Sequence, residues 1–199
     1  MTAIERPREG ARVFIVRHGN TFAHGDAPRR IGGRTDLALV DTGRDQARAL
    51  GRHFANRDIM FDGAQCGPLL RTRQTTRLLL SAAGQDRPVA VAEWLREIDH
   101  GPDEDRAEAE VLARLGQAAL DAWDRDAIPP QGWQVDVVAR RAAWRDLLAT
   151  ATGTVLVVTS NGNARFAFPG AAKLRTGAYG EIARDQRGRL TFEAWDVRP

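Results

Sequence analysis

The chain has 199 residues, of which 43% are hydrophobic and 28% are charged. This length and composition are typical of one globular domain with a sizeable core. Its single cysteine, Cys66, excludes an internal disulfide and any zinc site built from several cysteines. The formal net charge of +3 comes almost wholly from arginines that are scattered among acids, which argues against a nucleic-acid-binding stripe.

The chain shows no apolar run long enough to span a bilayer. Residues 1–10 are polar and lack the apolar core of a secretory signal. We therefore expect a cytoplasmic protein with a single domain over residues 1–199 and no membrane partner. The sequence does not predict the oligomeric state.

Strands and helices are expected to alternate along the chain. The apolar run at residues 13–16 indicates a buried strand, and the longer run at residues 153–159 is typical of a parallel sheet. Thr42 to Asp45 resembles a capping box before the first helix. The other expected strands are at residues 60–66, 88–92, 178–183 and 190–195, the last two forming a hairpin, and the expected helices are at residues 46–56, 68–83 and 135–150.

Two segments interrupt this alternation. Residues 22–40 carry glycines, a proline and arginines without periodicity, which indicates a long and functional loop. Residues 93–135 form an acidic excursion with one helix, which Pro129 ends. The sequence therefore predicts a three-layer α/β/α fold, with a mostly parallel central sheet, helices on both faces and a lid-like helical excursion over the strand ends.

Polar turns follow the two strongest strands, VRHGNT at residues 16–21 and VTSNGN at residues 158–163. In a parallel sheet both turns lie at the same edge, so His18 can face Asn161. A neutral imidazole attacks phosphorus readily, and a guanidinium such as that of Arg17 matches phosphate oxygens. The alternative is a histidine that only hydrogen-bonds the backbone at a strand end.

Four motifs together resemble a known family. They are residues 16–21 (VRHGNT), residues 33–47 (GRTDLALVDTGRDQA), residues 68–75 (PLLRTRQT) and residues 95–101 (LREIDHG). Their order and spacing are similar to those of the histidine phosphatase superfamily, also called the phosphoglycerate mutase-like family. The resemblance extends from about residue 13 to residue 162.

The resemblance implies roles for particular residues. His18 would become phosphohistidine, and Glu97 would protonate the leaving group and then activate water, although Glu93, Asp99 and Asp103 compete for the acid's role. The implied phosphate-binding residues are Arg17, Arg71, Asn161 and Thr21, and the implied substrate-binding residues are Asn20, His24, Arg34 and Gly162. No metal or cofactor is implied, because the arginines supply positive charge.

Two positions depart from the family pattern. His24 stands where an asparagine is usual, and Asn161 stands where a second histidine is usual. An asparagine keeps a hydrogen-bond donor but loses a positive charge, and charged hydrogen bonds are about twice as strong as neutral ones. We expect a working but slower or differently specialised enzyme, unless His24 or Arg165 restores the charge.

Three functions remain open. The first is hydrolysis of a small phosphomonoester through phosphohistidine, and the second is a mutase that returns the phosphoryl group to its substrate. The third is a phospholigand-binding protein without catalysis. The phosphatase is favoured, because the excursion is short for a closed mutase site.

Overall fold

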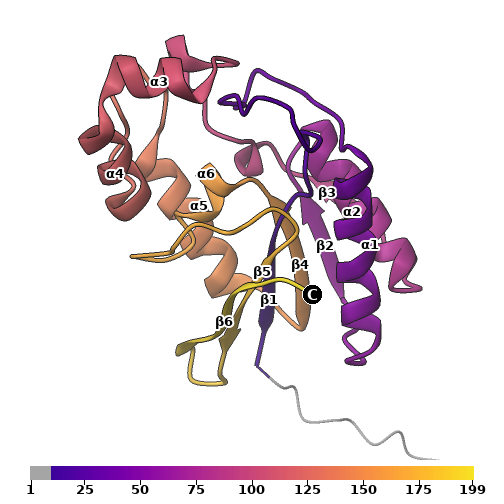
Figure 1. Ribbon diagram of the computed structural model, residues 1–199. Helices are drawn as coiled ribbons and strands as arrows, with labels where there is room; N and C mark the ends of the chain where they lie inside the picture. Colours follow the sequence, from indigo (N-terminus) through magenta and orange to yellow (C-terminus); the bar gives the residue numbers. More distant parts are fainter. Residues whose placement is uncertain (1–9) are drawn as a thin grey trace, which may run out of the picture.

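The structure is a computed structural model that describes residues 10–199. Residues 1–9, for which we expect no secretory signal, lie outside the described residues. Six strands form one sheet in the order β3-β2-β4-β1-β5-β6 (Figure 1). The strands are β1 (Arg12–Arg17), β2 (Gly63–Cys66), β3 (Val89–Val91), β4 (Thr154–Thr159), β5 (Tyr179–Arg184) and β6 (Leu190–Val197).

Four of these strands are parallel, because β4 pairs in parallel with both β1 and β2, and β2 pairs in parallel with β3. The hairpin of β5 and β6 extends the sheet with antiparallel pairing. The expected mostly parallel sheet and the expected hairpin are both confirmed. The helices are α1 (Asp41–Ala55), α2 (Leu70–Ala82), α3 (Glu108–Leu115), α4 (Gln117–Asp126), α5 (Val137–Thr150) and α6 (Asn161–Ala164).

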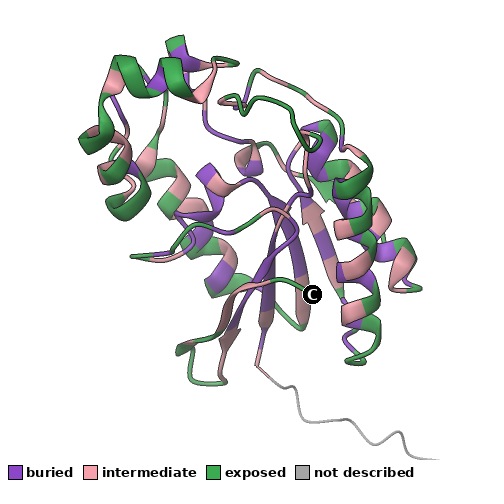
Figure 2. Cartoon of the chain, in the orientation of Figure 1, coloured by how far each residue is buried: buried purple, intermediate pink, exposed green. Residues whose placement is uncertain are grey.

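Successive side chains of the central strands point to opposite faces of the sheet, so the core has two layers. In β1, Phe14 and Val16 pack with residues of α1 and α2, whereas Val13 and Ile15 pack with residues of α5 and the excursion. This follows from the pleat, which points successive side chains to opposite faces. Both faces of the sheet are therefore covered (Figures 1 and 2), as the three-layer prediction requires.

The excursion differs from the prediction of one helix. It contains two short helices, α3 and α4, which meet at Gly116 with φ of +76°. A glycine adopts this backbone conformation without the steric cost of a Cβ, so the chain turns there instead of continuing as one helix. Two single-turn 3₁₀ helices, Glu93–Leu95 and Gly101–Asp103, precede them.

The capping box expected at Thr42 to Asp45 is wrong. Helix α1 starts at Asp41, and its N-cap Val40 makes no side-chain capping bond. The first turn of α1 instead holds the chain that follows β1. A Cβ on Gly43 would lie 2.1 Å from the Asn20 carbonyl oxygen, so a glycine is needed for this close approach.

Within residues 10–199, none of the helices is both long and apolar enough to cross a membrane.

Candidate active site

The turns after β1 and β4 lie side by side. Arg17 is the register partner of Thr159, and the His18 N–H donates to the Thr159 carbonyl oxygen at 3.1 Å. The main chain of Leu174 then connects the turns. Its carbonyl oxygen accepts from Arg17 Nη1 at 2.6 Å, and its N–H donates to Asn161 Oδ1 at 2.9 Å.

His18 is buried, with 4% of its surface exposed. Its Nδ1 lies 2.8 Å from the Gly19 carbonyl oxygen. Because a carbonyl oxygen only accepts, Nδ1 carries the proton and Nε2 keeps a free lone pair. Burial, followed by the charges of Arg71 and Arg17, lowers the pKa of His18 well below its ordinary value. The ring is therefore neutral at neutral pH.

Two arginines surround this histidine, but they occupy different positions. Burial lowers the pKa of Arg17 to about 10, so its guanidinium stays charged at neutral pH and lines the pocket in front of His18. Arg71 is wholly buried and donates to the carbonyl oxygens of Thr35 at 2.7 Å and Gly32 at 3.1 Å. Its charge acts on His18, although Arg71 is not among the residues that line the pocket.

Glu97 joins the excursion to the second turn. Its Oε1 accepts from the Ile98 N–H at 2.8 Å, and its Oε2 accepts from the Gly162 N–H at 3.2 Å. A Cβ on Gly162 would lie only 2.2 Å from Glu97 Oε1. The absence of a side chain at residue 162 therefore allows this carboxylate to lie against the turn.

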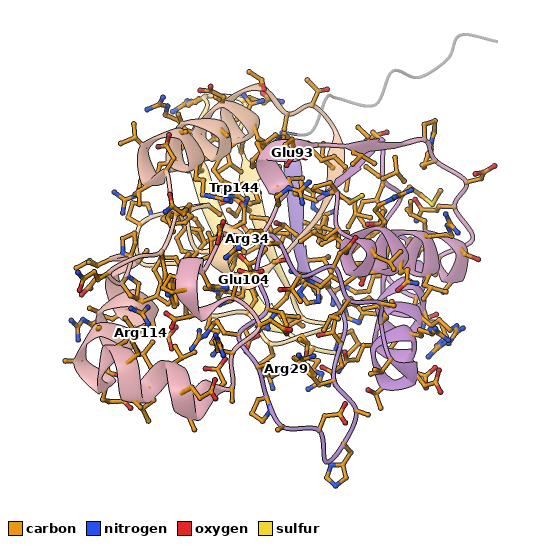
Figure 3. All side chains as sticks on the ribbon, turned by 90° about the horizontal axis from the view of Figure 1, so that it is seen from above. Arg29, Arg34, Glu93, Glu104, Arg114 and Trp144 are labelled. Atoms are coloured by element: carbon orange, nitrogen blue, oxygen red, sulfur yellow. The ribbon has the colours of Figure 1, made fainter. Side chains whose placement is uncertain are left out.

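Glu104 holds the loop that positions Arg71. It accepts from the N–H groups of Gly32 and Arg34, both at 3.0 Å, and from Thr35 Oγ1 at 2.8 Å. Burial alone would raise the pKa of Glu104, but contacts with His100, Thr35 and Arg34 outweigh it and lower the pKa to about 2. Figure 3 shows Glu104 beside Arg34. Loop 32–35 is thus held between an ionised carboxylate and the Arg71 guanidinium.

A pocket of about 320 Å³ opens in front of His18. The predicted site residues that line it are Arg17, His18, Asn20, Thr21, Glu97, Asn161 and Gly162. Three others do not. Arg71 is buried against loop 32–35, and His24 is exposed on the long loop. Arg34 is turned toward Asp99, where its Nε donates to Oδ1 at 3.1 Å.

Sequence reasoning missed several lining residues. Lys173 and Thr176 come from the segment after α6, and Arg30 and His100 come from the long loop and the excursion. Lys173 stands out in the sequence because it is the only lysine. This does not indicate where the side chain lies in the fold. The His100 ring lies 3.6 Å from Glu104 Oε2 and packs edge-on against Trp133.

Arg165 lines the pocket, as its position one turn after Asn161 allows. Its guanidinium is already engaged, since it donates to the Trp123 carbonyl oxygen and to Asp124 Oδ1, the latter at 3.2 Å, and lies over the Trp123 ring. It therefore brings a charge to the pocket wall with few free donors. Among residues 10–199, no three His, Cys, Asp or Glu side chains gather in a way that could hold a metal ion.

Comparison with known proteins identifies the family of this chain. Residues 13–192 match the family model of the histidine phosphatase superfamily (branch 1). The chain belongs to this superfamily. A 2,3-bisphosphoglycerate-dependent phosphoglycerate mutase of Methylocella silvestris is 32% identical over 158 residues, which are 76% of each chain.

Two other proteins are similar to this chain over different extents. A broad-specificity phosphatase of Saccharomyces cerevisiae is 37% identical over 87 residues, which are 43% of this chain and 37% of the yeast protein. The solved structure of a mycobacterial glucosyl-3-phosphoglycerate phosphatase superposes with a TM-score of 0.76 at 20% identity, covering 97% of this chain and 100% of that one. This last similarity concerns the fold alone.

Proposed function

We propose that the protein is a metal-independent phosphatase that hydrolyses a small phosphomonoester through a phosphohistidine on His18. The observation that carries the proposal is the state of the His18 ring. Its Nδ1 donates to the Gly19 carbonyl oxygen and leaves Nε2 unprotonated, in a pocket that Arg17 and Glu97 also line. The yeast relative, a broad-specificity phosphatase, supports the same reaction class.

The first step transfers the phosphoryl group to the protein. His18 Nε2 attacks phosphorus, the P–O bond to the alcohol breaks, and the carboxyl group of Glu97 gives a proton to the leaving oxygen. Arg17 binds the phosphoryl oxygens, while Arg71 stabilises their charge through its field. In the second step Glu97 takes a proton from water, which attacks phosphorus and releases inorganic phosphate and neutral His18.

We propose that Asn161 takes the place of the second histidine that is usual in the family, and that it donates to a phosphoryl oxygen. The Leu174 N–H binds Asn161 Oδ1 at 2.9 Å, so the amide orientation is set and Nδ2 is left as the donor. This donor is neutral, which predicts a slower enzyme than one with a charged partner at the same place.

Phosphate release from an aryl phosphate, in the presence of a metal chelator, tests the proposed function. We expect turnover in the native protein and a loss of more than about a thousandfold in the His18→Ala variant, because the nucleophile is gone. His53→Ala is the matched control, since His53 lies on α1 and contacts the Tyr179 hydroxyl at 3.0 Å. Unchanged turnover in His18→Ala would rule out the mechanism.

Phosphoryl transfer back to the substrate is the second candidate, favoured by the similarity to the Methylocella mutase. A mutase must exclude water while the phosphoryl group is on histidine. Product analysis with a phosphorylated hydroxy acid separates the two reactions. An isomerised product identifies the mutase, whereas inorganic phosphate and the free hydroxy acid identify the phosphatase.

A further inference from the structure

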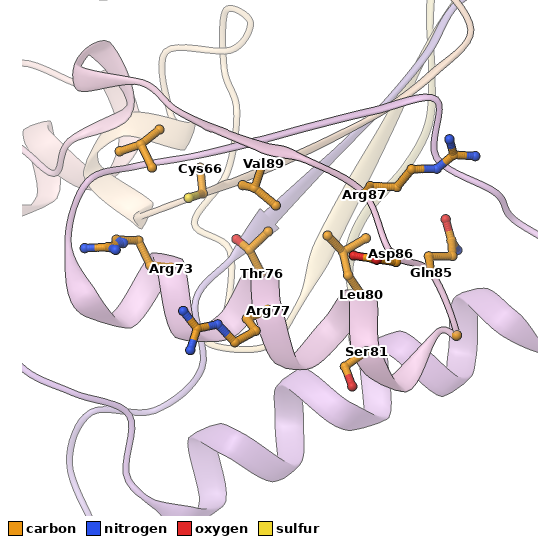
Figure 4. Close-up of a pocket in the computed structure, with 12 residues that line it drawn as sticks. Cys66, Arg73, Thr76, Arg77, Leu80, Ser81, Gln85, Asp86, Arg87 and Val89 are labelled. Atoms are coloured by element: carbon orange, nitrogen blue, oxygen red, sulfur yellow. The ribbon is translucent and has the colours of Figure 1, made fainter.

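A second pocket lies between the outer face of α2 and the edge strand β3 (Figure 4). It has a volume of about 610 Å³, which is within the range of small-molecule sites in proteins. None of its lining residues also lines the pocket in front of His18. The two pockets are therefore separate.

Three arginines line this second pocket. Arg73 and Arg77 come from α2, and Arg87 comes from the loop before β3. All three are exposed, and in the described part of the chain no side-chain hydrogen bond or ion pair engages their guanidinium groups. Asp86 is the one acid among the lining residues. The pocket thus carries an excess of positive charge with free donors.

The sequence around α2 leaves this charge uncompensated. Residues 63–85 contain no Asp or Glu, so Arg73 and Arg77, one turn apart, repel each other without an acid between them. Helix α1 provides the contrast. Its Arg44 and Arg48 have the same spacing, and each pairs with an aspartate one turn earlier, at 3.3 Å and 2.9 Å.

Part of the pocket wall is apolar. Leu80 and Val89 lie between the arginines in Figure 4, with Arg73 and Arg77 toward one end and Arg87 at the other. Val91 also lines the pocket and is 55% exposed. Burial raises the pKa of the Cys66 thiol, so this part of the wall stays uncharged. An apolar surface between cations suits a ligand that has both a ring and an anionic end.

We propose that this pocket is a second ligand site, which binds a small organic polyanion of the nucleoside diphosphate class. The two phosphates lie between Arg73 and Arg77, whose repulsion they relieve, and the nucleoside lies against Leu80, Val89 and Val91. Arg87 closes the far end of the pocket. Binding at this site does not depend on the reaction at His18.

Calorimetric titration with adenosine 5′-(α,β-methylene)diphosphate tests the proposal, because its P–C–P bridge prevents release of the terminal phosphate. We expect two binding events in the native protein, one at each pocket. The double variant Arg73→Gln/Arg77→Gln loses one event or weakens it more than about tenfold, since charged hydrogen bonds are removed. The Arg44→Gln/Arg48→Gln variant is the matched control and retains both events.

An Arg17→Gln variant identifies which event belongs to which pocket, because it loses only the event at the candidate active site. A single event in the native protein that Arg17→Gln abolishes and Arg73→Gln/Arg77→Gln leaves intact would overturn the second site. A single event with the opposite response would support the second site and show that the pocket in front of His18 does not bind this analogue. Pyrophosphate should bind the second site at least about tenfold more weakly than the nucleotide analogue, because it cannot contact the apolar wall. Equal affinities would exclude the nucleoside diphosphate class.

Discussion

The ring of His18 is buried beside Arg17 and Arg71, and this environment lowers the pKa of His18. The unfolded chain then binds a proton at a higher pH than the folded protein does. The free energy of unfolding therefore decreases as the pH falls through the ordinary histidine pKa of about 6.5 toward the lower folded value.

Urea denaturation at about pH 7.5 and about pH 5.5 measures this effect. We expect the native protein to lose more stability on acidification than His18→Asn, by up to about 1.4 kcal/mol for each pH unit between the two pKa values. His53 remains in both proteins, so its own lowered pKa cancels in the comparison. An equal loss of stability in the native protein and in His18→Asn would show that the His18 ring is not held neutral by the fold.

Asn161 offers a second test at the residue scale. An Asn161→Asp variant can still accept the Leu174 N–H, so the turn should keep its conformation. It replaces the Nδ2 donor, which we propose binds the phosphoryl group, with an anionic oxygen. We expect kcat/KM to fall by at least about a hundredfold, with inorganic phosphate binding reduced in parallel. Kinetics as in the native protein would show that residue 161 does not contact phosphate.

At the scale of elements, the excursion and the long loop are joined through Glu104. The carboxylate accepts from loop 32–35 and from the His100 N–H, and Arg71 donates to carbonyl oxygens of the same loop. An ionised group with this many donors contributes more than a neutral one could. The conformation of loop 32–35 thus depends on a residue outside the predicted site.

Glu104→Gln is expected to lower the free energy of unfolding by about 1.5–3 kcal/mol, because hydrogen bonds to a charged acceptor are weakened. Glu93→Gln is its control, since the Glu93 side chain is 72% exposed and, within residues 10–199, pairs only with Arg96, an interaction worth less than about 1 kcal/mol. Urea denaturation at neutral pH compares the two variants. Equal effects would show that Glu104 does not hold the loop.

Across the whole molecule, the features that could be predicted from the sequence are those that depend on single strands and local motifs. The apolar runs before Arg17 and Ser160 indicated parallel strands, and the register of β1 with β4 brings their turns together. Seven of the predicted site residues line one pocket, namely Arg17, His18, Asn20, Thr21, Glu97, Asn161 and Gly162. These residues follow strands or lie in motifs of fixed spacing.

The positions of the other site residues depend on contacts between segments far apart in the sequence, which a local sequence pattern does not reveal. The buried position of Arg71 results from two loop carbonyl oxygens that Glu104 helps to place. Lys173 reaches the pocket because the next residue, Leu174, bonds to Arg17 and Asn161. His24 and Arg34 belong to a loop without periodicity, so spacing could not show which of its side chains face the site.

We propose that His18 Nε2 carries the phosphoryl group during turnover. Rapid quenching in alkali during hydrolysis of a radiolabelled phosphomonoester, followed by peptide mapping, tests it most directly. We predict a label that is acid-labile and alkali-stable, reaches at most one per chain, and lies on the peptide that contains His18. Turnover without any such label, or a label on the peptide that contains His100, would contradict the account.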